Sequence, residues 1–185
     1  MERGWENVTI EDIATAANVS PRTFRNYFST KAEAVAAGHL ERMLSIADAL
    51  RGRPANEDIW AAITNSVAAQ FEPPERKSAA TADTKNWLKQ IRFVFGEPAI
   101  RGEVLKASAV AQDELSKAIA ERTGSRSGSE LYPQIASAVV IAIVGVVQER
   151  WLRNGATGSI VAALRAAFAQ VSAGLPHKAH TSVEK

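Results

Sequence analysis

Two arginines and an asparagine stand close together in the sequence and could read the edges of DNA bases. Arg22, Arg25 and Asn26 share one face of any helix that spans them, because residues three and four apart lie on the same side. Arginine can donate two parallel hydrogen bonds to guanine, and asparagine can do the same with adenine. This spacing indicates base recognition, and its alternative is a solvated polar face on an ordinary helical hairpin.

Two short helices separated by a tight turn are predicted to position these side chains. Thr9 suits the N-cap of the first helix, where Asp12 would form a weak capping box. Asn18 tolerates the left-handed backbone that the turn requires. Ser20 is the expected N-cap of the second helix, and Pro21 suits its first position. The apolar residues of the first helix repeat at helical spacing and are Ile10, Ile13, Ala14 and Ala17.

Three aromatic side chains are predicted to hold the second helix. Phe24, Tyr27 and Phe28 share a face and should pin this helix onto the first one. The opposite face, with Arg22 and Arg25, would then point outward. A helix held in this way has the geometry of a recognition helix that enters the major groove.

Three stretches in this region are Thr9-Ile10-Glu11-Asp12-Ile13-Ala14, Asn18-Val19-Ser20-Pro21-Arg22-Thr23-Phe24 and Tyr27-Phe28-Ser29-Thr30-Lys31. Together they closely resemble the DNA-binding signature of the TetR family of repressors. The family usually has glycine where this chain has Asn18, and it carries an amphipathic helix where this chain offers only Met1-Glu2-Arg3. We therefore expect Ile10, Ile13 or Phe28 to be partly uncovered. The resemblance implies that some residues lie toward base edges, namely Pro21, Arg22, Thr23 and Arg25 with Asn26 beside them, and that others hold phosphates, namely Thr9, Tyr27 and Lys31.

Composition favours an all-α fold, because alanine is abundant and β-branched runs are few. The net charge of +2 is too small to indicate nucleic-acid binding by itself. Only the stretch from Pro21 to Lys31 is locally basic, so any attraction to DNA must come from there. The absence of cysteine fits a cytoplasmic protein. The longest apolar run, Ala138–Val147, is about half of what a membrane-spanning helix needs, so no membrane segment is predicted.

Four regions are predicted along the chain. A helix-turn-helix head, 1–31, is followed by a connecting helix, 32–53, a regulatory ligand-binding and dimerisation domain, 54–175, and a disordered tail, 176–185. Within the domain, helices are expected from an N-cap at Asn56 to Phe71, around Trp87 to Phe95, and from Pro98 to Thr123, with a mobile connection at Glu75–Asp83. The periodic face of the Pro98 helix is Ile100, Val104, Leu105, Ala109, Leu115 and Ile119.

The segment Leu131–Leu152 is apolar on nearly every face, so it must be covered on all sides. We expect a second copy of the chain to supply that cover, through this segment and a final helix at Ser159–Ala173. The TetR resemblance implies that these helices form a four-helix bundle with those of the partner. A buried strand over Val139–Val147 is the alternative for the apolar run. Two heads about 34 Å apart would read a palindromic operator.

No catalytic site, metal site or cofactor is predicted. His39, His177 and His180 do not share a helix face, and no phosphate-binding glycine loop is present. The TetR resemblance implies a small-molecule site inside the helical domain, and the concentration of aromatic residues there predicts an apolar effector. Its candidate lining residues, for which ordinary core packing is the alternative, are Trp60, Thr64, Phe71, Trp87, Ile91, Phe95, Ser108, Gln112 and Gln148.

The sequence therefore predicts a homodimeric, all-α, TetR-type repressor that a small apolar ligand releases from double-stranded DNA. Two alternatives remain open at this point. One is a helical dimer or interaction protein that does not bind DNA, and the other is a ligand-dependent activator of the same architecture.

Overall fold

The computed structural model describes residues 8–16, 18–72, 97–125 and 130–176, and this part of the chain contains helices and no strand. The all-α prediction is confirmed. The predicted mobile connection at Glu75–Asp83, the helix around Trp87 and the tail after residue 176 lie outside the described residues. The helices are α1 (Ile10–Ala16), α2 (Pro21–Tyr27), α3 (Lys31–Arg51), α4 (Ile59–Phe71), α6 (Pro98–Thr123), α7 (Leu131–Arg153) and α8 (Ile160–Ser172).

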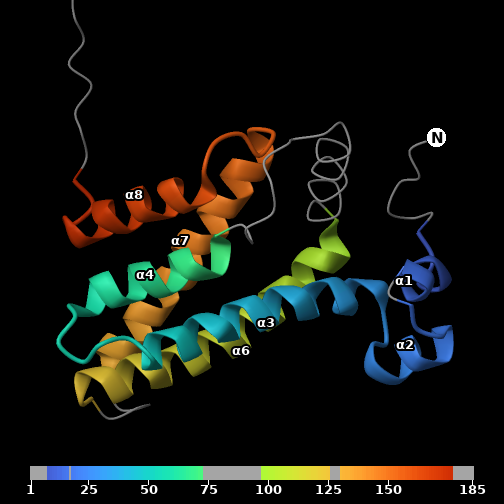
Figure 1. Cartoon of the computed structure of the whole chain (residues 1–185), viewed down its shortest axis with the longest axis horizontal. Helices are drawn as coiled ribbons and strands as arrows, with labels where there is room; N and C mark the ends of the chain where they lie inside the picture. Colours follow the sequence, from blue (N-terminus) through green and yellow to red (C-terminus); the bar gives the residue numbers. More distant parts are fainter. Residues whose placement is uncertain (1–7, 17, 73–96, 126–129, 177–185) are drawn as a thin grey trace, which may run out of the picture.

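The long helix α3 connects a small head to a larger body (Figure 1). The head consists of α1 and α2, which pack against each other beyond one end of α3. In the body, α3 packs along α6, α4 lies against both α3 and α8, and α7 contacts α6 and α8. The position of the head is therefore set mainly through α3.

One hydrophobic core unites the helices of the body. Burying a large aliphatic or aromatic side chain completely stabilises a fold by about 1.5–3 kcal/mol. Every long body helix contributes such side chains, so α3 is fixed rigidly at the end away from the head. The fully buried ones include Met43, Ile46 and Leu50 of α3, Ile63 and Val67 of α4, Leu115 and Ile119 of α6, Val140 and Val144 of α7, and Leu164 and Phe168 of α8.

Helix α6 begins at Pro98 and ends at Thr123, as predicted, but its buried face differs from the predicted one. Leu105 is 71% exposed and Ala109 is also exposed. Between Ile100 and Leu115 the buried positions are Ala107 and Ala111. Alanine at these positions allows a neighbouring helix backbone to approach closely, which a leucine would prevent. The two predicted positions, Leu105 and Ala109, were therefore wrong.

Helix α4 is capped by Asp58 and not by Asn56, which corrects the prediction. The Asp58 carboxylate accepts hydrogen bonds from the backbone amides of Trp60 and Ala61, each at 3.0 Å. These amides belong to the first turn, whose donors have no partner within the helix. A carboxylate also interacts favourably with the positive end of the helix dipole.

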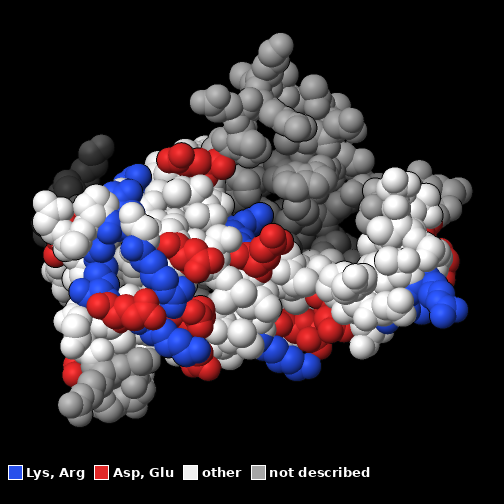
Figure 2. Space-filling view, turned by 60° about the horizontal axis from the view of Figure 1, so that its bottom comes forward, with Lys and Arg blue, Asp and Glu red and all other residues white. Residues whose placement is uncertain are grey.

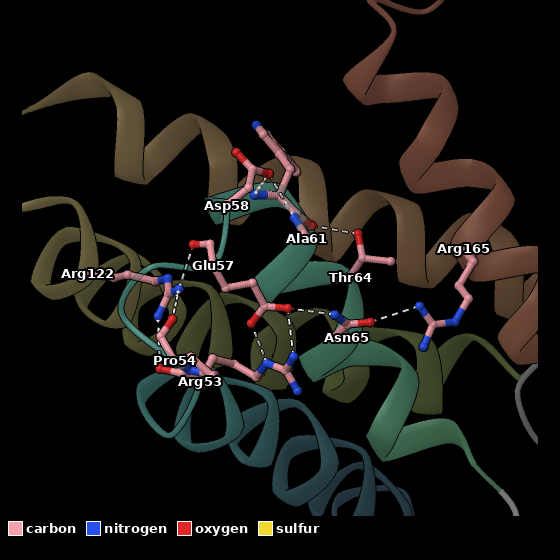
Figure 3. A network of polar contacts seen from close by, with 10 residues as sticks. Arg53, Pro54, Glu57, Asp58, Ala61, Thr64, Asn65, Arg122 and Arg165 are labelled. Atoms are coloured by element: carbon pink, nitrogen blue, oxygen red, sulfur yellow. Dashed lines mark hydrogen bonds and ion pairs between the residues drawn. The ribbon is translucent and has the colours of Figure 1, made fainter.

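A polar network fixes the connection between α3 and α4 (Figure 3). The Arg122 guanidinium donates to the backbone carbonyls of Arg53, Pro54 and Glu57, at 3.2, 2.6 and 2.8 Å. Arg53 donates two hydrogen bonds to the Glu57 carboxylate, both at 2.6 Å, and these lower the pKa of Glu57. The network continues through Asn65, which donates to Glu57 and accepts from Arg165. The far end of the body is thus held by charged groups as well as by its core.

Helix α7 covers the whole apolar run, so the strand alternative for Val139–Val147 is excluded. Its 23 residues, with a mean hydropathy of 1.8 in the most apolar window, are long and apolar enough to cross a membrane. Core helices of helical bundles have the same property, and α7 packs against α6 and α8. Several of its apolar side chains are nevertheless exposed, among them Leu131 at 68%, Ile135 at 52% and Val146 at 64%.

Candidate nucleic-acid interface

Helix α1 begins with the capping arrangement predicted from Thr9 and Asp12. The Thr9 hydroxyl accepts from the Asp12 amide at 3.1 Å, and the Asp12 carboxylate accepts from the Thr9 amide at 2.9 Å. The Thr9 hydroxyl also donates to the same carboxylate oxygen, at 2.9 Å. This closed exchange stabilises the first turn. It also engages the hydroxyl that the sequence assigned to phosphate binding.

The turn between α1 and α2 has the predicted left-handed residue. Asn18 has a φ of 55°, and the amide of Val19 donates to the carbonyl of Ala14 at 2.9 Å. The Ser20 side chain then accepts from the Thr23 amide at 3.0 Å, which confirms Ser20 as the N-cap of α2. The Ser20 and Thr23 hydroxyls are also hydrogen-bonded to each other, at 2.8 Å. These contacts fix both the start and the direction of α2.

Two aromatic side chains anchor α2, not three. Phe24 is 5% exposed, and its ring lies 5.3 Å from that of Phe28, tilted by 52°. Tyr27 is 75% exposed, so its predicted place in the buried group was wrong. Tyr27 is the last residue of α2, and the chain leaves the helix at Phe28. An exposed tyrosine at this position agrees with the other role assigned to it, contact with a phosphate.

The predicted reading face is exposed. Arg22, Arg25 and Asn26 all project into solvent, while Pro21 and Thr23 are half-buried on the same helix. On α2, the buried side chain is Phe24. The helix thus turns one side inward and presents two guanidinium groups and a carboxamide on the other.

Glu11 forms an ion pair with a candidate base-reading residue, which the sequence did not predict. Its carboxylate accepts from the Arg25 guanidinium at 2.6 Å, across the gap between α1 and α2. Both side chains are 56% exposed. Figure 2 shows acidic groups directly beside the basic groups of the head. The only available signal was the acidic residue in the first turn of α1, which does not reveal a partner fourteen positions away.

Lys31 links the start of α3 to the segment before α1. Its ammonium group donates to the carbonyl of Val8 at 3.0 Å, in a partly buried position. Next to it, Thr30 caps α3 by accepting from the Glu33 amide, and the Glu33 carboxylate accepts from the Ser29 amide. Lys31 is therefore a structural link within the head as well as a candidate phosphate contact.

The apolar side of the head is incompletely covered, as predicted. Ile10, Ile13 and Phe28 are each half-buried, whereas Ala14 and Phe24 are fully buried. Fewer apolar atoms are removed from water here than in the body, so the head gains less stability from burial.

The candidate effector residues that the structure describes are dispersed over three helices. Trp60 and Phe71 are partly buried and pack at opposite ends of α4 against the core. The Thr64 hydroxyl donates to the Trp60 carbonyl of its own helix at 2.7 Å. Gln112 on α6 and Gln148 on α7 are half-buried. Trp87, Ile91 and Phe95 lie outside the described residues.

One candidate effector residue, Ser108, lies at a junction between α3 and α6. Its hydroxyl is hydrogen-bonded to His39 Nε2 at 3.2 Å. Burial lowers the pKa of His39, and the nearby Arg42 charge lowers it further. The Arg42 guanidinium in turn lies over the Phe71 ring, 5.4 Å from its centroid. These contacts bring α3, α4 and α6 together on one side of the body.

A groove of about 370 Å³ lies elsewhere, between α3, α6 and the chain that leads to α4. Its lining includes Leu50, Arg51 and Arg122, and no candidate effector residue. Arg51 is paired there with Glu114 and Glu121, at 2.7 and 2.9 Å. The groove is therefore lined by charges that already have partners.

Comparisons with known proteins agree with this architecture. Residues 57–176, more than half of the chain, match the family model described as the MftR C-terminal domain. Residues 1–37 match the model of bacterial regulatory proteins of the tetR family.

Two relatives are transcriptional regulators by name. The HTH-type transcriptional regulator TcmR of Streptomyces glaucescens is 28% identical over 151 residues, which are 82% of this chain and 67% of the relative. MftR of Mycobacterium tuberculosis, named as a candidate mycofactocin biosynthesis transcriptional regulator, is 26% identical over 176 residues, 93% of this chain and 83% of the relative. Neither name describes an enzyme.

Proposed function

Because this chain belongs to the TetR family of bacterial transcriptional regulators, we propose that it is a homodimeric repressor that binds a palindromic operator. The observation that carries the proposal is the fixed orientation of α2. Ser20 caps it and Phe24 anchors it, while Arg22, Arg25 and Asn26 project into solvent. In this proposal these three residues reach base edges, with Pro21 and Thr23 beside them. Thr9, Tyr27 and Lys31 contribute phosphate contacts.

Dimerisation follows from the length of the reading helix. Helix α2 has seven residues, so one head can contact only a few base pairs. A two-fold pair of heads doubles the number of bases read and requires a palindrome. The exposed apolar residues of α7 support pairing through Leu131–Leu152, and Ser159–Ala173 would complete the interface. In this arrangement residues 1–31 form the head, 32–53 the connecting helix and 54–175 the regulatory domain.

A small apolar effector is the proposed release signal. It would bind in the body beside α3, α4 and α6, where Phe71 and Ser108 lie partly buried. Since α3 also carries the head, occupancy beside it would change the spacing of the two heads. The proposal fails if metabolite extracts, fractionated by polarity, never release the protein from its selected DNA.

The test of DNA recognition is selection of duplexes from a random-sequence pool, followed by titration at several salt concentrations. We expect a palindromic site to be enriched, and Arg22→Ala to weaken binding to it by about 1–3 kcal/mol. Random duplexes should lose less affinity, because they offer Arg22 no matching base edge.

Arg101→Ala is the matched control, since it removes the same charge from an exposed position on α6. It should leave the preference for the selected site unchanged. An equal loss on selected and random duplexes for Arg22→Ala would refute base recognition by this side chain. The absence of any DNA binding at low salt would favour a helical dimer with another role. Activation of a reporter by the bound protein would favour the activator.

A further inference from the structure

We propose that Glu11 is a specificity-determining residue, which holds the Arg25 guanidinium for a base edge and disfavours its pairing with a phosphate. The inference rests on the proposed function, because it concerns how the head distinguishes its operator from other DNA. It starts from the one ion pair that the structure describes between α1 and α2.

The pair is not needed to build the head. The first turn of α1 is capped through Thr9 and Asp12, and Glu11 takes no part in that exchange. Helix α2 is capped by Ser20 and anchored by Phe24. An ion pair as exposed as this one adds little to stability. Its main effect is therefore on the direction and the charge of the Arg25 side chain.

The geometry leaves Arg25 able to bind a base. The bond to Glu11 uses Nη2, and the described residues show no partner for Nε or Nη1. A guanidinium has five N–H donors, and a guanine edge accepts two parallel hydrogen bonds. Arg25 can therefore reach a guanine while Glu11 keeps its side chain in place.

A phosphate partner is disfavoured in the same geometry. A phosphate that approaches Arg25 must come close to the Glu11 carboxylate, and the two negative charges repel each other. Two cations near the reading face are already engaged, since Arg25 pairs with Glu11 and Lys31 donates to Val8. Arg22 has no ion pair within the described residues. The positive charge that Arg25 presents to random DNA is therefore partly compensated by Glu11, whereas Lys31 keeps its charge.

The test compares the wild-type chain with Glu11→Gln, on the selected duplex and on random duplexes, over a series of salt concentrations. Glutamine keeps the size and helix propensity of the side chain and removes its charge. We expect the affinity for random DNA to rise roughly two- to fivefold, the range that an exposed ion pair can account for. The salt dependence should steepen by about 0.9 per head, because each freed Arg25 can neutralise one more phosphate.

The preference for the selected duplex should fall in the same variant. When binding sites for Glu11→Gln are selected again from the random pool, their consensus sequence should be less strongly defined at the base that Arg25 contacts. Asp113→Asn is the matched control, because it makes the same change of charge at an exposed position of α6 in the body. It should change neither affinity nor preference. Circular dichroism of Glu11→Gln should match the wild type, which excludes misfolding as the cause.

Introducing Glu11→Gln into the Arg25→Ala variant distinguishes two explanations, positioning of Arg25 by Glu11 and a general repulsion of DNA by the Glu11 charge. If Glu11 acts through Arg25, Glu11→Gln has no further effect on specificity in that background. An equal gain of affinity with and without Arg25, on selected and random duplexes alike, overturns the inference. An unchanged preference in Glu11→Gln also overturns it, while leaving the proposed repressor intact. If the wild-type chain itself binds no duplex at low salt, the proposed function is what has failed.

Discussion

The environment of His39 differs from that of a free side chain. It lies on the side of α3 that faces α6, where it is hydrogen-bonded to Ser108 and partly removed from water. Burial disfavours the charged imidazolium, and the positive charge of Arg42 disfavours it further, so the pKa of His39 is lowered. The neutral ring is therefore the form that holds the two helices together near pH 7.

This environment makes stability depend on pH. As the pH falls through about 6.5, the unfolded chain binds a proton at His39 that the folded chain does not bind, so the folded state loses stability. His39→Gln retains a hydrogen-bonding group and removes the titration. We expect the free energy of unfolding to fall more steeply in the wild type than in the variant between about pH 7.5 and 5.5.

Chemical denaturation at each pH measures this difference. His177 and His180 are present in both proteins, so their contribution cancels in the comparison. Parallel declines in the two proteins would show that His39 has the same affinity for protons in both states.

Single side chains show which structural roles could be predicted from the sequence and which could not. Ser20, Asn18 and Phe24 were predictable, because caps, left-handed turns and buried faces depend on neighbours a few positions away. Tyr27 was misplaced because helical spacing describes a face but not the residue at which the chain leaves it. Glu11 was missed because its partner is brought to it by the turn between two helices.

Among the elements, α6 contains the clearest contrast between buried and exposed leucines. Leu115 is 1% exposed and belongs to the main core, whereas Leu105 is 71% exposed on the same helix. Both lie in the helix interior, so the same substitution has the same effect on helix propensity at the two sites. Any difference between them then reports burial.

We expect Leu115→Ala to destabilise the protein by about 2–5 kcal/mol, because it removes buried methyl groups and leaves a cavity. Leu105→Ala, the matched control, should change the free energy of unfolding by less than about 0.5 kcal/mol. Urea denaturation of the two variants provides the measurement. Similar losses at both sites would place Leu105 in a buried environment.

The helices also show which features the sequence pattern can predict and which it cannot. The ends of α6 and α8 were predictable from Pro98, Gly124 and Ser159, whose backbone or side-chain chemistry starts or stops a helix. The buried face of α6 was not predictable, because an alanine such as Ala107 or Ala111 is apolar enough to be buried and small enough to be exposed. Only the packing of the neighbouring helices decides between these outcomes. The Asp58 cap shows a similar limit, since Asn56 has the same local preference.

At the scale of the whole molecule, the apolar surface of α7 is the feature that the isolated chain leaves without cover. Val146 is 64% exposed on α7, and Val110 is 55% exposed on α6. If the proposed dimer forms through α7, the first of these valines becomes buried in it. The second lies outside the proposed interface and serves as the control.

Val146→Glu is expected to weaken dimerisation roughly 100-fold or more, because each copy would bury a carboxylate without a partner. Val110→Glu should leave the dimer unchanged. Sedimentation at several protein concentrations distinguishes the two outcomes. A dimer that tolerates Val146→Glu would require a different pairing surface, and a monomeric wild type would remove the proposed palindrome as well.

The attachment of the head to one long helix has a mechanical consequence. Helix α3 has 21 residues and is about 31 Å long, and its distal half is fixed in the core. A rotation of about 10° at the middle of the helix carries its head end, about 16 Å away, through nearly 3 Å, which approaches the 3.4 Å step between neighbouring nucleotides. Because the start of α3 packs on α6 through Ala32 and Ile100, such a movement must carry the first turns of α6 with it, and in the proposed dimer it would displace the head by almost one base step.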